Sequence, residues 1–223
     1  EIPHSLGNLS ELNYLDIELS FSNYVPSLEM HSKNLNWLSH LSSLKYLNLN
    51  GVNLSSTGVT NWLHHVNMLP SLLELDLSEC GLVSHSLSLQ RINFTSLSVL
   101  DLSYNSFNTS SSPSWLFNLT SLRKLDLSRN SFRGRIPRVI GNMCKLKFLS
   151  LSGNDFYGEK IEEFWGSLSN CPNNTLVLES LDLRGCGLEG QLPASLGMLK
   201  SLQYLDLSFN HMNGSIPQSL GQL

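Results

Sequence analysis

Charged residues are scarce in this chain. They form only 14% of its 223 residues, and the formal net charge is −4, so the polar surface must consist mainly of Ser, Asn and Thr. A slightly acidic chain is not a general nucleic-acid binder. No apolar run reaches the ~18 residues of a membrane span, and no basic-then-apolar leader opens the sequence, so we expect this segment not to insert into a membrane.

Catalytic and metal-binding motifs are also missing. The sequence has no Gly-x-Ser-x-Gly, His-Glu-x-x-His or phosphate-loop pattern, and its four cysteines are at least 15 residues apart, which excludes the usual zinc spacings. Aspartates do recur at one spacing, as Asp76, Asp101, Asp126, Asp182 and Asp206. Because Ser150 interrupts that series, we interpret it as a solvated polar ladder rather than a paired-carboxylate site. We predict no enzyme activity, no metal and no cofactor.

What the sequence does contain is a repeat. The pattern Leu44-x-x-Leu47-x-Leu49 recurs, with a period of about 24 residues and two insertions of roughly eight; its middle leucines are Leu15 (a weaker copy), Leu47, Leu75, Leu100, Leu125, Leu149, Leu181 and Leu205. Alternate leucines share one face of a short strand, and a single strand cannot bury them. Stacked copies therefore predict an α/β fold: a right-handed, horseshoe-shaped solenoid with a parallel sheet on the concave face and short helical or 3-10 turns on the convex face.

A second column marks the turn that follows each strand. Asparagine stands there in four copies, at Asn105, Asn130, Asn154 and Asn210, and Val52, Cys80 and Cys186 replace it in three others. A buried amide in this turn must be satisfied, and stacked backbone groups can satisfy it. Cysteine is a weaker polar group, so we expect the turns without asparagine to be less firmly tied.

A third segment, Gly-x-Ile-Pro or a close variant, follows later in several copies, and it identifies a family. The full pattern Leu-x-x-Leu-x-x-Leu-Asp-Leu-Ser-x-Asn-x-Leu/Phe-x-Gly-x-Ile-Pro, best seen at 199–217, resembles the plant-specific class of extracellular leucine-rich repeats. More narrowly, 36–39, 61–63 and 171–175 are similar to ectodomains of plant receptor-like proteins that detect secreted microbial proteins. The resemblance implies a leucine-rich-repeat solenoid with a second sheet on its flank, which should be partial because the first three copies lack Gly-x-Ile-Pro.

The domain prediction follows from the repeat. Residues 1–223 should form a single domain of about eight repeats, because a quasi-linear core does not divide into globules. The sequence begins and ends within a repeat, so we expect a fragment that lacks both caps.

Glycosylation sequons and cysteines indicate the compartment. Seven Asn-x-Ser/Thr sequons occur, at Asn8, Asn53, Asn93, Asn108, Asn118, Asn173 and Asn213. Together with four cysteines they favour an extracellular (apoplastic) glycoprotein, as part of a membrane-anchored or secreted protein. The alternative is that an Asn- and Ser-rich repeat produces sequons by chance. Cys144 and Cys171 fall on adjacent coils, where a disulfide could form; the spacing leaves this open.

The second insertion contains a helical pattern. Within 159–168, Ile161, Phe164, Trp165 and Leu168 stand at helical spacing. The helix should pack on the convex core; the alternative is a protrusion that binds a partner.

The outward strand positions supply candidate ligand contacts. Exposed rings aligned beside Arg are typical of binding anchors, although they could also merely shield the sheet. The predicted concave-face residues are Tyr46, Glu74, Tyr104, Arg123, Lys124, Arg129, Lys147, Phe148, Arg184, Tyr204 and Phe209.

Basic charge is concentrated on two coils. The segment Ser121–Lys147 carries +7 and the remainder −11. We hypothesise that it docks an acidic protein surface or an anionic polysaccharide; the alternative is a charge run that balances acidic neighbours.

The family resemblance implies a function. We expect a ligand-binding ectodomain of a plant cell-surface immune receptor, with a secreted microbial protein or peptide and a co-receptor kinase as partners. The alternative is a secreted inhibitor of a microbial cell-wall-degrading enzyme, similar to polygalacturonase-inhibiting proteins. Those have capped ends, so the uncapped and lengthened copies here favour the receptor. A purely structural scaffold is a third option.

Overall fold

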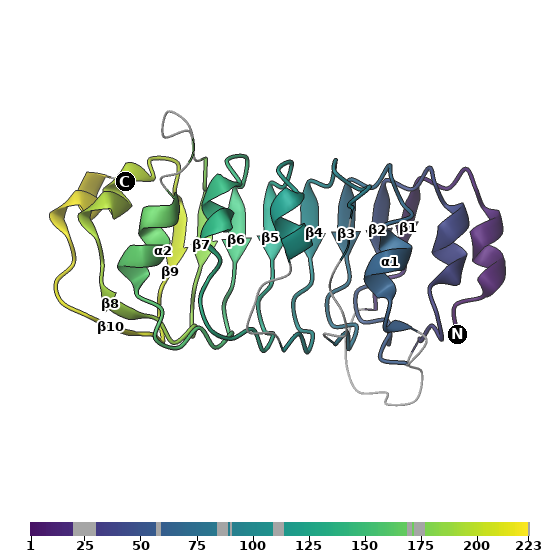
Figure 1. The fold of residues 1–223 in the computed structure, drawn as a ribbon, viewed down its shortest axis with the longest axis horizontal. Helices are drawn as coiled ribbons and strands as arrows, with labels where there is room; N and C mark the ends of the chain where they lie inside the picture. Colours follow the sequence, from purple (N-terminus) through teal and green to yellow (C-terminus); the bar gives the residue numbers. More distant parts are fainter. Residues whose placement is uncertain are drawn as a thin grey trace.

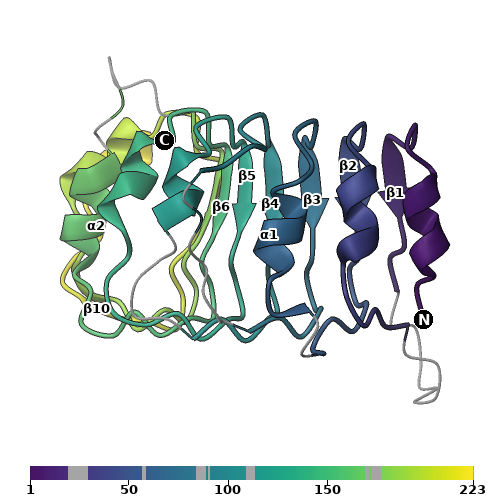
Figure 2. The ribbon, with the colours of Figure 1, turned by 45° about the vertical axis from the view of Figure 1, so that its right-hand side comes forward.

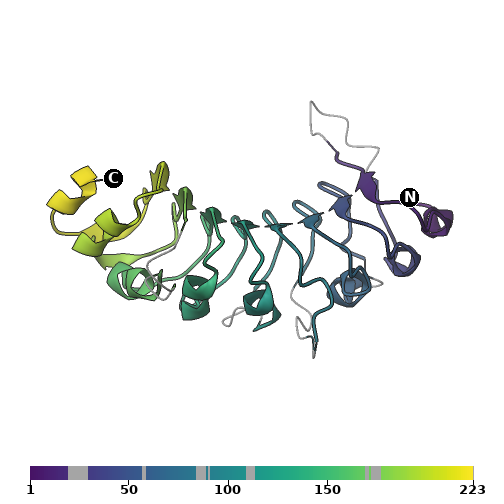
Figure 3. The ribbon, with the colours of Figure 1, turned by 90° about the horizontal axis from the view of Figure 1, so that it is seen from above.

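The chain winds into a row of stacked coils. The computed structural model describes residues 1–19, 30–56, 59–83, 89, 91–108, 114–168, 171 and 177–222. Figure 1 shows the strands side by side along the length of the molecule, and Figure 3 shows them on the inner side of an arc whose outer side carries the helical turns. The predicted solenoid is confirmed.

One parallel sheet lines the concave face. Its strands are β1 (Tyr14–Asp16), β2 (Tyr46–Asn48), β3 (Glu74–Asp76), β4 (Val99–Asp101), β5 (Lys124–Asp126), β6 (Phe148–Ser150), β7 (Ser180–Asp182) and β9 (Tyr204–Asp206). They follow one another in this order, all parallel, and the middle leucines pair from Leu15 and Leu47 to Leu181 and Leu205. This in-register stacking fixes which side chains form rows across the sheet.

Short helices form the convex face. They are η1 (His4–Asn8), η2 (Asn36–His40), α1 (Trp62–Val66), η4 (Ser114–Asn118), η5 (Arg138–Asn142), α2 (Ile161–Leu168), η7 (Ala194–Met198) and η8 (Gln218–Gln222), and Figure 2 shows several of them on the side away from the strands. Glycine allows neighbouring helices to approach: a Cβ on Gly141 would collide with the Ser167 carbonyl oxygen. Leucines from both faces meet in one continuous core.

A second sheet occupies part of the flank. β8 (Glu189–Gln191) and β10 (His211–Asn213) pair in parallel. In the described part of the earlier coils the flank holds only isolated bridges, among them His31–Asn53 and Val83–Ser106. The second sheet is therefore partial, as the missing Gly-x-Ile-Pro segments predicted.

Asparagine ties each turn to the preceding coil. The Asn130 amide donates to the carbonyls of Leu102 and Leu127, and its oxygen accepts the Phe107 N–H. Asn105, Asn154 and Asn210 make corresponding bonds. Each of these side chains thus satisfies one acceptor and at least one donor of the coil before it, as the sequence predicted; Asn210 accepts the N–H groups of both Cys186 and Leu188.

The cysteine turns make the same two links with other atoms. The Cys80 thiol lies 3.1 Å from the Leu49 carbonyl oxygen, and the Leu54 N–H bonds to the Cys80 carbonyl. Gly81 follows with φ of +69°, a left-handed conformation that glycine adopts without strain. The arrangement recurs at Cys186, Phe156 and Gly187, where φ is +71°. Both cysteine turns therefore keep the two links, with a backbone carbonyl as acceptor and a thiol as the weaker donor; that they are less firmly tied stays a prediction.

The inserted helix packs on the core. α2 buries Ile161, Phe164, Trp165 and Leu168, which confirms the packing interpretation rather than a protrusion. On its polar side, the Glu162 carboxylate accepts the Gln191 N–H at 2.7 Å, so the helix also covers the β8 strand.

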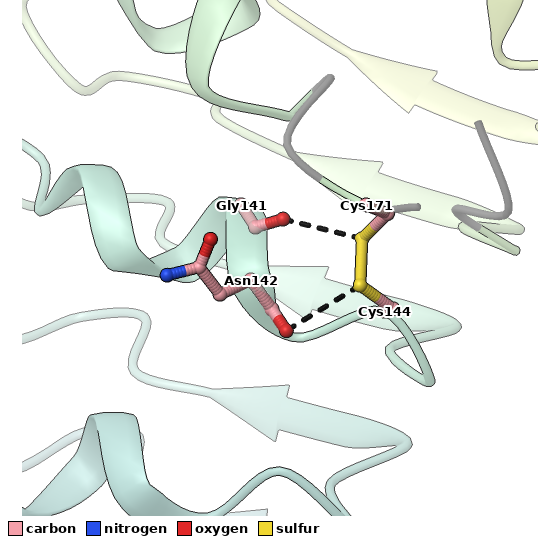
Figure 4. The surroundings of a disulfide bond; sticks show 4 residues. All are labelled: Gly141, Asn142, Cys144 and Cys171. Carbon is pink, nitrogen blue, oxygen red and sulfur yellow. Dashed lines mark hydrogen bonds between the residues drawn. A yellow bond between two sulfur atoms is a disulfide. The ribbon is translucent and has the colours of Figure 1, made fainter. Parts of the chain in front are cut away.

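A disulfide joins the coils on either side of this helix. Figure 4 shows Cys144 bonded to Cys171, with Sγ of Cys171 3.2 Å from the carbonyl oxygen of Gly141 at the end of η5. The two Cα atoms are 5.5 Å apart across 27 residues of sequence. A bridge that closes a loop of this length typically stabilises a protein by about 3 kcal/mol.

Candidate functional site: the concave face

The concave sheet presents side chains in rows. We define three of them: the leading row (Lys45, Leu73, Ser98, Arg123, Lys147, Glu179, Gln203), the first row (Tyr14, Tyr46, Glu74, Val99, Lys124, Phe148, Ser180, Tyr204) and the rim row (Gly51, Glu79, Tyr104, Arg129, Gly153, Gly185, Phe209). Adjacent strands in a sheet are about 4.8 Å apart, so residues within a row are close neighbours. With Arg184, which lies beside the rim row, the rows contain all eleven predicted concave-face residues.

The rim row has an unusual backbone. Glu79, Tyr104, Arg129 and Phe209 have φ between +53° and +58°, and Gly51, Gly153 and Gly185 have φ from +61° to +75°. The conformation recurs at this position in seven coils, so it belongs to the turn that ends each strand and is not a local strain. Side chains in this row are exposed where they are large: the exposed fraction of Tyr104 is 51% and that of Phe209 is 76%.

The aspartate column is a structural element of the strands. The Asp126 carboxylate accepts the backbone N–H and the hydroxyl of Ser128, and Asp76, Asp101 and Asp206 hold the serines after them in the same way. Burial raises the pKa of Asp76 and of Asp126 above the ordinary value of 3.8. Asp101 is buried, so the predicted solvated ladder was wrong for the middle of the sheet.

Two tyrosines occupy the first coils. Tyr14 and Tyr46 stack with ring centroids 4.2 Å apart, and both hydroxyls point to the Asp16 carboxylate, at 3.2 and 3.4 Å. Burial, followed by the hydrogen bond with Tyr14, raises the pKa of Tyr46 to about 12. This end of the face is therefore aromatic and acidic.

Basic side chains lie over aromatic rings further along. Arg129 sits 5.6 Å from the Tyr104 ring centroid, and Arg184 sits 4.7 Å from that of Phe209. Such cation–π contacts hold a guanidinium in place while leaving its N–H groups free to donate. Among the described residues, no salt bridge reaches Arg123, Arg129 or Arg184.

Most of the basic segment is paired. Lys124 bridges to Asp101 at 3.0 Å, and Lys147 to Glu179 at 2.6 Å. Although burial alone would lower it, the Asp101 carboxylate raises the pKa of Lys124. On the flank, Arg133, Arg135 and Arg138 bridge to Asp155, Glu163 and the buried Glu159. Balance against acidic neighbours thus accounts for five of the eight basic residues.

Sequence reasoning missed the counter-ions. Glu179 occupies the leading-row position next to Lys147, and this could have been found by comparing equivalent positions of successive repeats. Lys124 and Asp101 lie two residues out of line across β5 and β4, a diagonal contact that equivalent positions do not reveal.

The sequons within the described residues lie away from the concave rows. Asn8 and Asn118 end convex helices, Asn213 ends β10 on the flank, and Asn53, Asn93 and Asn108 lie in the connections between strands and helices. Asn53 is half-buried and the other five are exposed. Asn173 lies outside the described residues.

Other kinds of site find no support. Among the residues that the structure describes, no three His, Cys, Asp or Glu side chains gather as a metal site would require. In that same part of the chain, no helix is long and apolar enough to cross a bilayer. A small pocket, lined by Leu54, Trp62 and Leu82 among others, encloses about 60 Å³, far below the volume of a typical ligand site.

The repeat geometry matches a known family. Leucine-rich-repeat sequence models match residues 95–156, 145–171, 177–199 and 201–223, more than half of the chain. The chain belongs to the leucine-rich-repeat family.

Plant receptor-like proteins are similar in sequence to this leucine-rich-repeat chain. Receptor-like protein EIX1 of Solanum lycopersicum is 39% identical over 134 residues, which are 52% of this chain and 13% of that protein. Receptor-like protein 32 of Arabidopsis thaliana is 43% identical over 187 residues, 83% of this chain and 18% of that protein. The chain therefore resembles part of a receptor-like ectodomain and spans less than a fifth of these relatives.

A solved leucine-rich-repeat structure extends the likeness to three dimensions. It is the Arabidopsis receptor kinase HAESA in complex with the peptide hormone IDA and the co-receptor SERK1, with a TM-score of 0.70 and 32% sequence identity. The match covers 95% of this chain and 32% of the HAESA chain.

Proposed function

We propose that the chain is the ligand-recognition part of a plant cell-surface immune receptor, and that its concave face binds a secreted microbial protein or peptide. The observation that carries this proposal is the Tyr104–Arg129 pair in the middle of the sheet, an exposed ring under a guanidinium without a salt bridge among the described residues. Tyrosine and arginine are the residue types that most often anchor protein interfaces.

Three further observations support this assignment. The similar proteins are receptor-like proteins, and the structural neighbour HAESA was solved with a peptide hormone and a co-receptor. The described sequons leave the concave rows free of glycan. The disulfide between Cys144 and Cys171 suits an extracellular, oxidising compartment. A co-receptor kinase is the expected second partner.

The test is capture of a ligand from pathogen culture filtrate by the glycosylated chain, compared with a variant that lacks the carrying pair, Tyr104→Ala/Arg129→Ala. Capture that the double variant loses by about tenfold or more supports the proposal. Equal capture by both proteins excludes this part of the concave face. Inhibition of a fungal pectinase by the purified chain, without ligand capture, would instead establish the inhibitor function.

A further inference from the structure

Exposed charge on the concave face changes sign along the sheet. The concave face has an acidic end, which we define as Asp16 and Glu18, beside the rows at β1, with the half-buried Glu74 of the first row and the exposed Glu79 of the rim row at β3. Near β5 to β7 the face has a basic end, which we define as Arg123, Arg129 and Arg184. Lys45 is an exposed exception at the acidic end, and Lys147 at the basic end is already paired with Glu179.

The coil between the two ends is neutral. Around β4 the rows hold Ser98, Val99 and Tyr104, and the one carboxylate of that strand, Asp101, is buried and paired with Lys124. In the rim row, Tyr104 lies directly between Glu79 and Arg129. The concave face therefore changes from acidic at β1 and β3 through neutral at β4 to basic at β5–β7, along seven successive strands.

The carboxylates at the basic end are less exposed than its arginines. Asp126 and Asp182 are half-buried, and each uses one oxygen to accept a backbone N–H of its own strand end. The arginines, in contrast, are exposed, and two of them are held over rings. At the acidic end, no salt bridge among the described residues reaches Glu74 or Glu79.

We propose that this surface binds an extended polypeptide segment whose own charge is divided: a basic stretch over β1–β3, neutral residues over β4 and an acidic stretch over β5–β7. The inference rests on the proposed function and specifies its ligand. With strands about 4.8 Å apart and about 3.3 Å per extended residue, the neutral stretch needs about three residues and the whole segment about ten. Complementary charge then fixes the direction in which the segment lies.

The probe is a synthetic peptide of about twelve residues with a Glu/Ser block, a Gly/Ser middle and a Lys/Ser block. The comparator has the same composition with Glu and Lys alternating. By fluorescence anisotropy at low salt, the chain should bind the divided peptide at least about tenfold more tightly than the alternating one. This preference should shrink as salt shortens the range of the charges.

Charge-reversed variants provide the decisive comparison. Glu74→Lys/Glu79→Arg reverses the part of the acidic end next to β4, and Arg123→Glu/Arg129→Glu reverses the part of the basic end next to β4; each should weaken binding of the divided peptide about tenfold. The quadruple variant exchanges both sets of charges, keeps Asp16, Glu18 and Arg184, and has the same net charge as the natural chain. It should bind the divided peptide more tightly than either double variant does, with the peptide lying in the opposite direction. A photo-crosslinker on the Glu block should then move from the β5 coil to the β3 coil.

The choice of substitutions limits the risk that a variant fails to fold. Glu79→Arg and Arg129→Glu exchange side chains that the rim row already holds at equivalent left-handed positions, and circular dichroism checks each variant. The matched control, Arg91→Glu/Lys145→Glu, makes the same charge change at exposed positions outside the three rows and should leave binding unchanged.

Three results would overturn the inference: equal binding of the two peptides, single-end variants that bind as tightly as the natural chain, or a quadruple variant that stays weak. If the chain captures a secreted protein yet ignores the divided peptide, the proposed function stands and this inference fails.

Discussion

Two kinds of turn tie strand ends of this solenoid to the preceding coil through a polar side chain. In the turns of Asn105, Asn130, Asn154 and Asn210 a side-chain amide serves the preceding coil, whereas at Cys80 and Cys186 a backbone carbonyl and a thiol serve the same groups. The Cys-Gly dipeptide explains the difference. Glycine with positive φ follows both cysteines, and this conformation lets the cysteine carbonyl face the preceding coil. What the fold requires is therefore a satisfied donor and acceptor, not one residue type.

The largest effect should come from removing an amide. Asn130→Ala leaves the buried Phe107 N–H without its acceptor. The Leu102 and Leu127 carbonyls lose one of two donors each and keep the amides of Asn105 and Asn154. We expect the free energy of unfolding to fall by about 2–3 kcal/mol, measured by urea denaturation. Asn142→Ala, at an exposed position on η5, should change it by less than about 0.5 kcal/mol. Similar losses in both variants would show that the amide is not the tie.

The cysteine turn should break at its glycine rather than at its thiol. Gly81→Ala places a Cβ at φ of +69°, 3.3 Å from Cβ of Ser55, and should cost about 1–2 kcal/mol in the same assay. Gly166→Ala within α2, where the added Cβ meets nothing within 4 Å, should instead stabilise by about 0.5–1 kcal/mol. A neutral Gly81→Ala would mean that the carbonyl does not depend on the left-handed glycine.

Converting one kind of turn into the other would sharpen the comparison. Cys80→Ala should cost only about 1 kcal/mol, because the Leu54 N–H keeps its backbone partner. Cys80→Asn alone leaves Gly81 in place, whereas Cys80→Asn/Gly81→Ser recreates the Asn-Ser pair of 105–106 and 130–131. A double-mutant cycle should therefore show a favourable coupling of about 1 kcal/mol. Strict additivity would contradict it.

The smallest effect concerns pH. Burial, aided by the charge of Asp101, raises the pKa of Asp126 above 3.8, so the folded chain binds this proton more tightly than the unfolded chain does. The contribution of Asp126 to stability is then complete below pH 3.8 and falls as the pH rises through the folded pKa. Asp126→Asn should remove that decline. The free energy of unfolding of the variant, measured by urea denaturation, should therefore increase relative to that of the natural chain as the pH rises from 3 to 6. A constant difference would contradict the burial argument.

The leucine spacing was enough to predict the architecture. It gave eight strands, their order and the register of Leu47 with Leu75, because alternating apolar residues dictate which face is buried. The apolar residues at helical spacing between Ile161 and Leu168 were equally sufficient to predict the helix α2. Both predictions depend on one-dimensional periodicity, which a single sequence contains in full.

Features that depend on backbone rotation or on contacts between coils could not be predicted as well. Glycines at Gly51, Gly153 and Gly185 are consistent with positive φ in the rim row. Glu79 and Arg129 have positive φ as well, but their residue types do not predict it. The placement of Arg129 over Tyr104 and of Lys124 beside Asp101 depends on side-chain rotamers. The concave rows could thus be predicted from sequence. The change from acidic to basic side chains along the sheet became visible only once the residues in salt bridges were known.

The bonds of the turn asparagines all run in one direction. Asn105 accepts the N–H of Leu82, and Asn130 that of Phe107, so each winding that precedes a turn asparagine is completed by the one that follows it in the sequence. A ribosome makes the chain from its amino end. Each winding that emerges therefore waits one repeat for its closing partner, and the growing edge of the nascent protein always carries unfinished hydrogen bonds ready to receive the next repeat.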